Sequence, residues 1–346
     1  MKTKQNIRNC SYEELVSFLK KENEKTFRIN QVYDWIWRKS IGSFFEMKNI
    51  PKTTRELLET NFFIDKAIPE LKQESSDGTI KTVFRLIDKT YVEGVLIPTD
   101  NRTTACISSQ VGCNAKCSFC ATGKMAFKRN LTAGEIYDQV FEINKQSEEI
   151  YNAKLSNIVF MGMGEPLLNY ENTLGSLDRI ISEKGLGFSP RRITLSTVGI
   201  PKMIKKLADD DIKFNLAVSL HTANNEKRNK IIPINRKYPI DTLMESLVYF
   251  HEKTKKRITF EYLLLENFNN NIDDAQELAE LCKAIPVKIN LIEYNEIDNS
   301  NFKKSAEEKT IAFANYLESK NMLVQIRKSR GQDIDAACGQ LALKHK

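Results

Sequence analysis

Seven short apolar segments alternate with helical patterns after residue 102, and this alternation limits the possible folds more than any other feature. Each segment is rich in the β-branched and aromatic residues typical of strands. They are TTACISS (103–109), LSNIVFMG (155–162), RRITLST (191–197), FNLAVSLH (214–221), RITFEYLLL (257–265), KINLIEYN (288–295) and LVQIRKS (323–329). Such repetition predicts parallel strands joined by helical crossovers, in an open doubly wound sheet or a full or partial barrel. Both architectures place chemistry at the carboxyl ends of the strands.

The helical crossovers have recognisable starts. Thr132 with Glu135, and Ser305 with Glu308, match the capping-box pattern that begins a helix. The sequence therefore predicts helices that begin at these two positions.

The segment before the alternation predicts a smaller helical unit. Ser11 and Glu14 form another capping-box pattern. Residues 1–65 hold 12 Lys and Arg against 9 Asp and Glu, which fits an accessory RNA-binding module or simply a small core with a solvated surface. An apolar stripe at helical spacing follows the first helix, at Ile29, Val32, Tyr33, Ile36 and Trp37.

Two further apolar segments, 79–87 and 90–98, flank Asp88 and Lys89 and predict an antiparallel hairpin between the two regions. We therefore expect a helical domain over 1–75, a β-hairpin linker over 76–98 and an α/β core over 99–346.

Charge and hydropathy exclude some classes of protein. No stretch approaches 18 apolar residues without a charge, and the first residues lack the apolar core of a signal peptide, so we expect a cytoplasmic protein with no membrane partner. With 52 Lys and Arg against 45 Asp and Glu, the net charge of +7 suits a polyanionic partner. Seven cysteines, an odd number, argue against a disulfide framework and favour metal or redox chemistry.

Three of the cysteines lie in one short segment. Cys113, Cys117 and Cys120 have the spacing C-x3-C-x2-C, which lets three thiolates converge from one loop on one inorganic centre. Structural zinc needs four protein ligands, and no fourth Cys or His follows nearby. A 4Fe-4S cluster held by three cysteines leaves one iron open to substrate. The spacing therefore favours a catalytic cluster.

A glycine-rich turn ends the strand over 155–162. In Met161-Gly162-Met163-Gly164-Glu165-Pro166, the glycines allow close approach of a ligand and the carboxylate can accept a hydrogen bond from an ammonium group. The alternative is a turn that needs glycine only for packing. Beside the three cysteines, cofactor binding is the favoured interpretation.

Cys106, the cysteine triplet, GMGEPLLN (162–169) and GQDIDAACGQL (331–341) together resemble one family. The chain is similar to the dual-specificity RNA methyltransferases of the radical S-adenosylmethionine superfamily, which make 2-methyladenosine in 23S rRNA and in tRNA. The resemblance runs nearly end to end. It implies a partial (β/α) barrel with a small N-terminal helical domain, and Pro166 favours this family over the related adenine-C8 methyltransferases that confer antibiotic resistance.

The resemblance also implies the site residues. The cluster ligands match Cys113, Cys117 and Cys120. The contacts to S-adenosylmethionine match Gly164, Glu165, Ser196, Ser219, Leu220, His221 and Asn295. Cys338 matches the residue that carries the methyl group as S-methylcysteine, Cys106 its transient disulfide partner, and Glu93 the proton acceptor. Taken alone, His221 is more often a structural histidine and the two cysteines inert buried thiols.

The implied partners are 23S rRNA and tRNA, an external electron donor and a disulfide reductant, and we expect a monomer. Arg191, Arg192, Arg327, Lys328 and Arg330 are candidate phosphate contacts, with solvated surface charges as the alternative. Two other classes of function stay open: an iron–sulfur protein that binds RNA without catalysis, and a radical enzyme that acts on a peptide or a metabolite.

Overall fold

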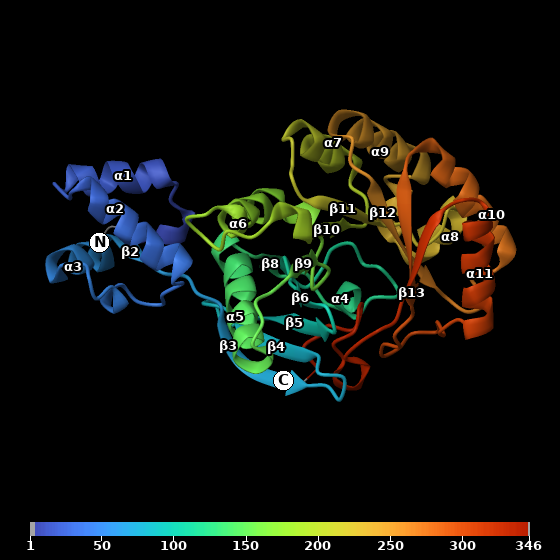
Figure 1. Ribbon diagram of the computed structural model, residues 1–346, viewed down its shortest axis with the longest axis horizontal. Coiled ribbons are helices and arrows are strands. Elements are labelled where there is room, and N and C mark those ends of the chain that lie inside the picture. The colour runs from blue at the N-terminus through green and yellow to red at the C-terminus, as the bar shows by residue number, and fades with distance from the viewer. Residues whose placement is uncertain (1–3, 345–346) are drawn as a thin grey trace.

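The computed structural model describes residues 4–344, so the outermost residues of the first and last predicted domains lie outside it. Its main feature is a ten-stranded sheet in the order β14-β13-β12-β11-β10-β9-β6-β5-β4-β3 (Figure 1). The strands are β3 (Ile68–Glu74), β4 (Ile80–Arg85), β5 (Tyr91–Thr99), β6 (Arg102–Cys106), β9 (Asn157–Phe160), β10 (Ile193–Thr197), β11 (Asn215–Ser219), β12 (Ile258–Leu264), β13 (Val287–Glu293) and β14 (Leu323–Arg327).

Strands β6 and β9 to β14 pair in parallel, and within the sheet each lies beside the strand that precedes it in the chain. A doubly wound sheet reverses its strand order at a switch point, whereas a barrel keeps chain order. Because the order here never reverses, the sheet is a partial (β/α) barrel. The predicted fold class is confirmed, and all seven predicted segments form strands of it.

Helices connect these strands, and all except the short α4, which lies in the loop after β6, cover the outside of the barrel (Figure 1). They are α4 (Ala121–Lys124), α5 (Ala133–Tyr151), α6 (Tyr170–Ile181), α7 (Pro201–Asp209), α8 (Asn225–Ile231), α9 (Ile240–Thr254), α10 (Ile272–Leu281) and α11 (Glu307–Ser319). The capping box of Thr132 and Glu135 is present at the start of α5. The one predicted at Ser305 is wrong: α11 begins after Ala306, and Ser305 instead accepts a hydrogen bond from Asn270.

The predicted hairpin is present as β4 and β5, which pair antiparallel. It is not a separate linker, because β5 also pairs with β6 and β4 with β3. Strand β3 lies inside the segment 1–75 that the sequence predicts as helical. The three strands β3 to β5 therefore extend the barrel sheet, and we call them the antiparallel extension.

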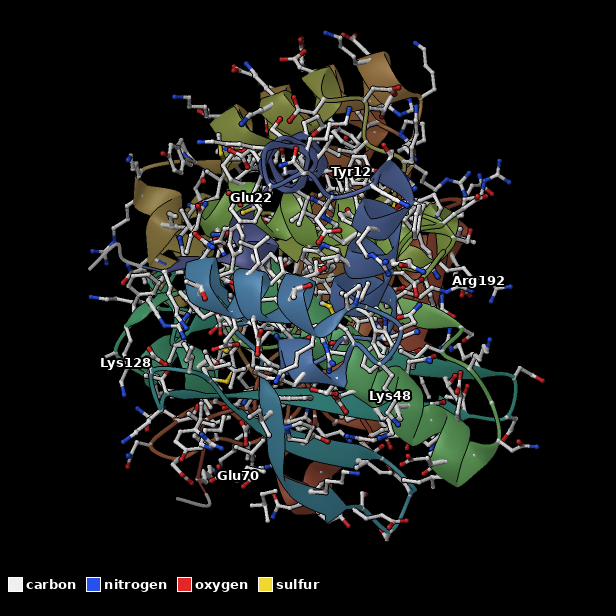
Figure 2. All side chains as sticks on the ribbon, turned by 90° about the vertical axis from the view of Figure 1, so that its left-hand side faces the viewer. Tyr12, Glu22, Lys48, Glu70, Lys128 and Arg192 are labelled. Carbon is white, nitrogen blue, oxygen red and sulfur yellow. The ribbon has the colours of Figure 1, made fainter. Side chains whose placement is uncertain are left out.

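The N-terminal unit contains α1 (Tyr12–Lys21), α2 (Thr26–Tyr33) and α3 (Lys52–Asn61), with a π-helical turn, η2 (Asp34–Arg38), after α2. Two short strands, β1 (Gln5–Asn6) and β2 (Phe62–Phe63), pair in parallel and close the unit. The predicted stripe of Ile29, Val32, Tyr33, Ile36 and Trp37 is buried. Figure 2 faces this end of the molecule and shows the charged side chains of Glu22 and Lys48, both exposed.

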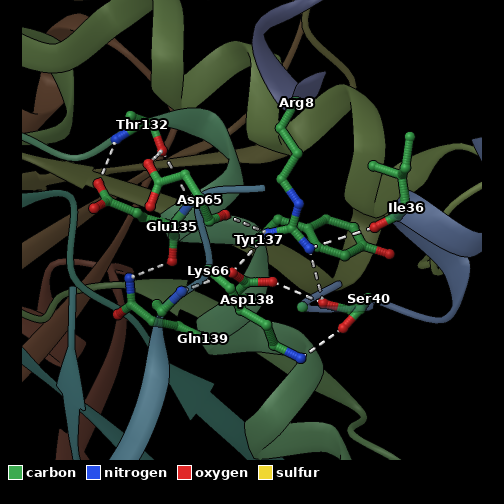
Figure 3. A network of polar contacts seen from close by, with 12 residues as sticks. Arg8, Ile36, Ser40, Asp65, Lys66, Thr132, Glu135, Tyr137, Asp138 and Gln139 are labelled. Atoms are coloured by element: carbon green, nitrogen blue, oxygen red, sulfur yellow. Dashed lines mark hydrogen bonds and ion pairs between the residues drawn. The ribbon is translucent and has the colours of Figure 1, made fainter. Parts of the chain in front are cut away.

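A buried ion pair joins the N-terminal unit to the barrel (Figure 3). Arg8 Nη1 lies 2.6 Å from Asp138 Oδ2 on α5, and neither side chain is exposed. Ser40 donates to the other oxygen of Asp138 at 2.7 Å, and Arg8 also donates to the Asp65 carbonyl at 3.2 Å. Because a buried charge without its partner is costly, this network fixes how the unit sits on α5.

Across residues 4–344, the helices are all too short or too polar to cross a membrane.

Candidate functional site

The three clustered cysteines lie in the loop that follows β6. Two short strands, β7 (Gln110–Val111) and β8 (Arg129–Asn130), pair antiparallel and close this loop at its base. Cys113 and Cys117 are buried and Cys120 is half-buried, and all three line one cavity at the mouth of the barrel. The structure therefore brings the predicted cluster ligands to one place.

Three thiols are the donor set of a 4Fe-4S cluster with one open iron, whereas structural zinc needs four protein ligands. Within residues 4–344, no three His, Cys, Asp or Glu side chains are grouped to hold a single metal ion. Zinc holds every thiolate about 2.3 Å from one ion, whereas a cluster spreads its thiolates over several irons. Burial raises the pKa of Cys113 to about 12 and also raises the pKa values of Cys117 and Cys120, so binding a cluster must release protons. Three thiols around one cavity fit a 4Fe-4S cluster.

Glu165 and Gly164 line the same cavity. The buried Glu165 carboxylate accepts hydrogen bonds from Leu167 N (3.0 Å), Thr197 Oγ1 (2.7 Å) and Val198 N (2.8 Å). A carboxylate has about four acceptor positions, so one stays available to a ligand ammonium group. Gly164 has φ +102°, and a Cβ there would lie 2.6 Å from Gln110 Cβ, so only glycine fits this turn.

The other predicted cofactor contacts divide into two groups. Ser196, Ser219 and His221, at the carboxyl ends of β10 and β11, line the cavity. Leu220 is fully buried and does not line it. Asn295 does not line it either; its Nδ2 donates to the Cys338 carbonyl at 3.1 Å. In this structure Asn295 therefore contacts the loop that carries Cys338 instead of the cavity.

His221 combines the two roles that the sequence left open. Its Nδ1 accepts a hydrogen bond from Leu263 N at 3.0 Å, and its ring lies edge-to-face against Phe119 with centroids 4.6 Å apart. Burial lowers the pKa of His221 to about 3, so the ring is neutral at physiological pH. The same ring lines the cavity. His221 is thus a satisfied structural histidine whose remaining ring nitrogen is the one available to a ligand.

Cys338 lies between two cavities. It lines the cavity with the three clustered cysteines, and it also lines a second cavity together with Cys106, the last residue of β6. Burial, and then the nearby Cys338 sulfur, raise the pKa of Cys106 to about 12. Cys338 is exposed to solvent, but the protein atoms packed around its sulfur raise its pKa to about 11. Two thiols far apart in sequence therefore share one cavity.

The second cavity has a basic rim. Arg327, Lys328 and Arg330 line it, immediately after β14. Two other candidate phosphate contacts, Arg191 and Arg192, are exposed and line neither cavity. Figure 2 shows Arg192 at the surface.

Glu93 lies in β5, behind the C-terminal segment, and lines neither cavity. Its side chain is 1% exposed, with Lys81 Nζ 3.5 Å from Oε1. Leu343 N donates to Oε2 at 3.2 Å, while Oε1 has no hydrogen-bond partner. The structure thus places a buried carboxylate, ion-paired with Lys81 through Oε1 and bonded to Leu343 through Oε2, beside the C-terminal segment.

Sequence reasoning missed Arg228 on α8, which is fully buried. It donates to the carbonyls of Val198 (2.6 Å), Ser219 (3.1 Å) and Leu220 (3.1 Å), so it ties together the ends of β10 and β11 that form the cavity wall. No local pattern distinguishes this arginine in NEKRNKI, because only the fold brings the carbonyls to it.

Comparison with known proteins agrees with this geometry. The Radical SAM superfamily model matches residues 107–282, and the ribosomal RNA large subunit methyltransferase N-terminal domain model matches residues 5–64. The crystal structure of a radical SAM methyltransferase from Sphaerobacter thermophilus superposes with a TM-score of 0.92, at 38% identity, over 97% of this chain and 99% of that one. The fold and cavity therefore define a radical S-adenosylmethionine enzyme, a class that uses a 4Fe-4S cluster and S-adenosylmethionine.

Two relatives narrow the class. Proteins from Flavobacterium johnsoniae and Thermotoga neapolitana, both named probable dual-specificity RNA methyltransferase RlmN, are 52% and 42% identical to this chain. Each alignment covers 99% of this chain and 98% of the relative. The chain belongs to the RlmN family of radical S-adenosylmethionine RNA methyltransferases.

Proposed function

We propose that the protein methylates carbon 2 of one adenosine in the peptidyl-transferase centre of 23S rRNA and of the adenosine next to the anticodon in tRNA. The position of Cys338 is the observation that carries this proposal. Its sulfur belongs both to the cavity with the cluster ligands and to the cavity with Cys106. A methyl group loaded on Cys338 from the first cavity is therefore within reach of a base in the second.

Carbon 2 of adenine is electron-poor and does not attack an electrophilic methyl group, so the methyl must be activated on the protein. When bound, the cluster and two molecules of S-adenosylmethionine supply the methyl group and the 5′-deoxyadenosyl radical that activates it. Cys113, Cys117 and Cys120 would hold the cluster. Gly164, Glu165, Ser196, Ser219 and His221 would hold the cofactor, with Leu220 and Asn295 supporting these contacts from behind the wall.

Cys338 loses its proton and holds the methyl group as a thioether. This methyl group would lose one hydrogen atom to the bound radical, and once its carbon has bonded to carbon 2, the electron released would pass to the cluster. Glu93, the proposed proton acceptor, would then take the proton of carbon 2. The Cys106 thiolate then attacks the Cys338 sulfur and forms a disulfide. The broken sulfur–carbon bond leaves its electron pair on the former methyl carbon, which takes a proton and becomes the new methyl group. A dithiol reductant returns two electrons to the disulfide.

RNA binding follows from the charges near the second cavity. The target base must leave its stack to enter, and Arg327, Lys328 and Arg330 are placed to contact the phosphates beside it. The N-terminal unit would add an accessory RNA contact. An external one-electron donor completes the set of partners. We place the enzyme in the cytoplasm, as a monomer.

The decisive test is an anaerobic reaction of the reconstituted enzyme with methyl-labelled S-adenosylmethionine and either 23S rRNA or tRNA, followed by nucleoside mass spectrometry. We expect 2-methyladenosine, and none with Cys338→Ala at unchanged iron content. Formation of 8-methyladenosine would assign the resistance chemistry instead. Cofactor cleavage without any RNA modification would show that the substrate is not RNA.

A further inference from the structure

The Cys338 loop, residues 331–341, contacts the turn between β3 and β4. Ser75 Oγ donates to Asp333 Oδ1 at 2.6 Å, and Ser76 N donates to Asp333 Oδ2 at 3.0 Å. In the other direction, Gly331 N donates to Asp77 Oδ2 at 2.9 Å. Each side of the contact thus supplies a carboxylate to donors on the other side, and bonds to an ionised acceptor are the stronger kind.

The turn and the loop also pack closely. Gly331 has φ +68°, and a Cβ there would lie 2.8 Å from Thr79 Cγ2 and 2.9 Å from Ala336 Cβ. Any other residue at this position would push the loop away from β4. Gly331 and Asp333 belong to the motif GQDIDAACGQL. The contact with the β3–β4 turn therefore gives these two motif residues a structural role that is separate from that of Cys338.

A second contact lies further along β4. Lys81 is 1% exposed, and its Nζ donates to the Asp335 carbonyl at 3.4 Å while lying 3.5 Å from Glu93 Oε1. A buried ammonium group needs such partners, since burial without them disfavours its charge. Lys81 therefore connects the middle of the Cys338 loop to the carboxylate in β5.

The barrel holds the loop from the opposite side. Asn295 donates to the Cys338 carbonyl at 3.1 Å, and Ala121 N in the cluster-loop helix α4 donates to the Gly339 carbonyl at 2.7 Å. In Figure 1 the C-terminal segment, in red, accordingly runs between the strands of the antiparallel extension and the barrel. The loop is therefore held by hydrogen bonds both from the antiparallel extension and from the barrel.

We propose that the antiparallel extension is a clamp that keeps the Cys338 thiol at the wall shared by the two cavities. Asp77, Lys81 and Asp333 are then positioning residues for the methyl-carrying cysteine. This inference rests on the proposed function, in which one sulfur reacts with a cofactor, a base and the Cys106 thiolate. Each reaction needs the sulfur in line with its partner, and an unrestrained loop would seldom meet that condition.

Asp333→Asn tests the clamp, with Ser75→Ala as the milder variant and Asp209→Asn as the matched control. Asp209 is also a surface carboxylate that accepts hydrogen bonds, from Tyr249 and Lys253, but it lies at the end of α7. Two quantities are measured on the reconstituted enzyme: amide hydrogen exchange of the Cys338 loop, and the rate at which Cys338 gains a labelled methyl group, read by peptide mass spectrometry.

For Asp333→Asn we expect amide exchange in the Cys338 loop to become about tenfold faster or more, and Cys338 methylation to become about tenfold slower or more. The iron content and the amide exchange in α5 should stay unchanged. Asp209→Asn should match the wild type. If amide exchange in α5 also becomes faster in Asp333→Asn, the same two measurements on Ser75→Ala decide the test.

The proposal is overturned if both variants keep wild-type loop exchange, or if exchange rises while methylation keeps its wild-type rate. A wild-type enzyme that never gains a methyl on Cys338 would instead refute the proposed function, and the exchange data would still decide whether the clamp holds the loop.

Discussion

Cys106 and Cys338 line the same cavity, although one ends the first parallel strand of the barrel and the other lies in the loop after the last one. The curvature of the partial barrel makes this possible, since the loops at the carboxyl ends of barrel strands meet over a common mouth. The two thiols are thus placed to form a disulfide only in the folded chain.

This placement predicts the behaviour of Cys106→Ala. Without the attacking thiolate, the bond between Cys338 and the RNA cannot be resolved, so a covalent protein–RNA adduct should accumulate. A denaturing gel with labelled tRNA would show it as a slowly migrating band that is absent for Cys106→Ala/Cys338→Ala. Normal turnover by Cys106→Ala would exclude the disulfide step.

Gly164→Ala should impair cofactor binding. The added Cβ would lie 2.6 Å from Gln110 Cβ at a φ of +102°, so the cavity wall must shift. We expect the Kd for S-adenosylmethionine, measured by anaerobic equilibrium dialysis, to rise by about tenfold or more, which corresponds to about 1.4 kcal/mol. Gly175→Ala is the control. Gly175 lies in α6, and a Cβ there would contact only Ala133 Cβ of α5, at 3.5 Å, so this variant should bind the cofactor normally.

The buried ion pair between Arg8 and Asp138 should be important for stability. Arg8→Met leaves Asp138 charged and buried without its cation, and loss of one partner of such a pair costs about 3–5 kcal/mol of unfolding free energy. Urea unfolding followed by tryptophan fluorescence measures this loss. The exposed pair of Lys4 and Glu59 provides the contrast: Lys4→Met should cost less than about 1 kcal/mol. Equal effects would contradict the argument.

Asp65 should make stability depend on pH. Burial, and then the nearby Glu135 and Asp138, raise the pKa of Asp65 to about 7, and Asp65 Oδ1 has no hydrogen-bond partner. Because this pKa exceeds the unfolded value of 3.8, the folded state binds the extra proton, and the stability from Asp65 is lost as the pH rises through 7.

Asp65→Asn removes that pH-dependent cost. We expect its Tm to exceed the wild-type Tm by about 2 °C or more at pH 8 and by much less at pH 5. Scanning calorimetry at the two pH values measures the difference. An equal shift at both would mean that Asp65 does not titrate in this range.

Local sequence patterns predicted the elements of the barrel well. Strand-forming segments, the capping box at Thr132 and the spacing of Cys113, Cys117 and Cys120 all depend on neighbours a few residues away. The same locality explains the error at Ser305, where an Asn270 side chain from another part of the chain takes the hydroxyl that would have capped the helix.

Long-range contacts account for what the sequence did not predict. The sequence did not predict strand β3 because most of its side chains are exposed and show no apolar alternation. Its strand conformation depends on pairing with β4. The resemblance to a family assigns Leu220 and Asn295 to the cofactor site by their positions near strand ends. Whether their side chains face the cavity depends on packing around Arg228 and the Cys338 loop.

The sequence by itself determined the α/β class and the family, and it pointed to three cysteines as candidate cluster ligands, because periodicity and motif spacing are properties of the chain. Only the tertiary structure decided that the hairpin extends the barrel sheet, that Cys338 separates two cavities and that Asp77, Lys81 and Asp333 hold its loop. These relationships join residues distant in the chain, and their contacts exist only once parallel strands in chain order have curved into a barrel.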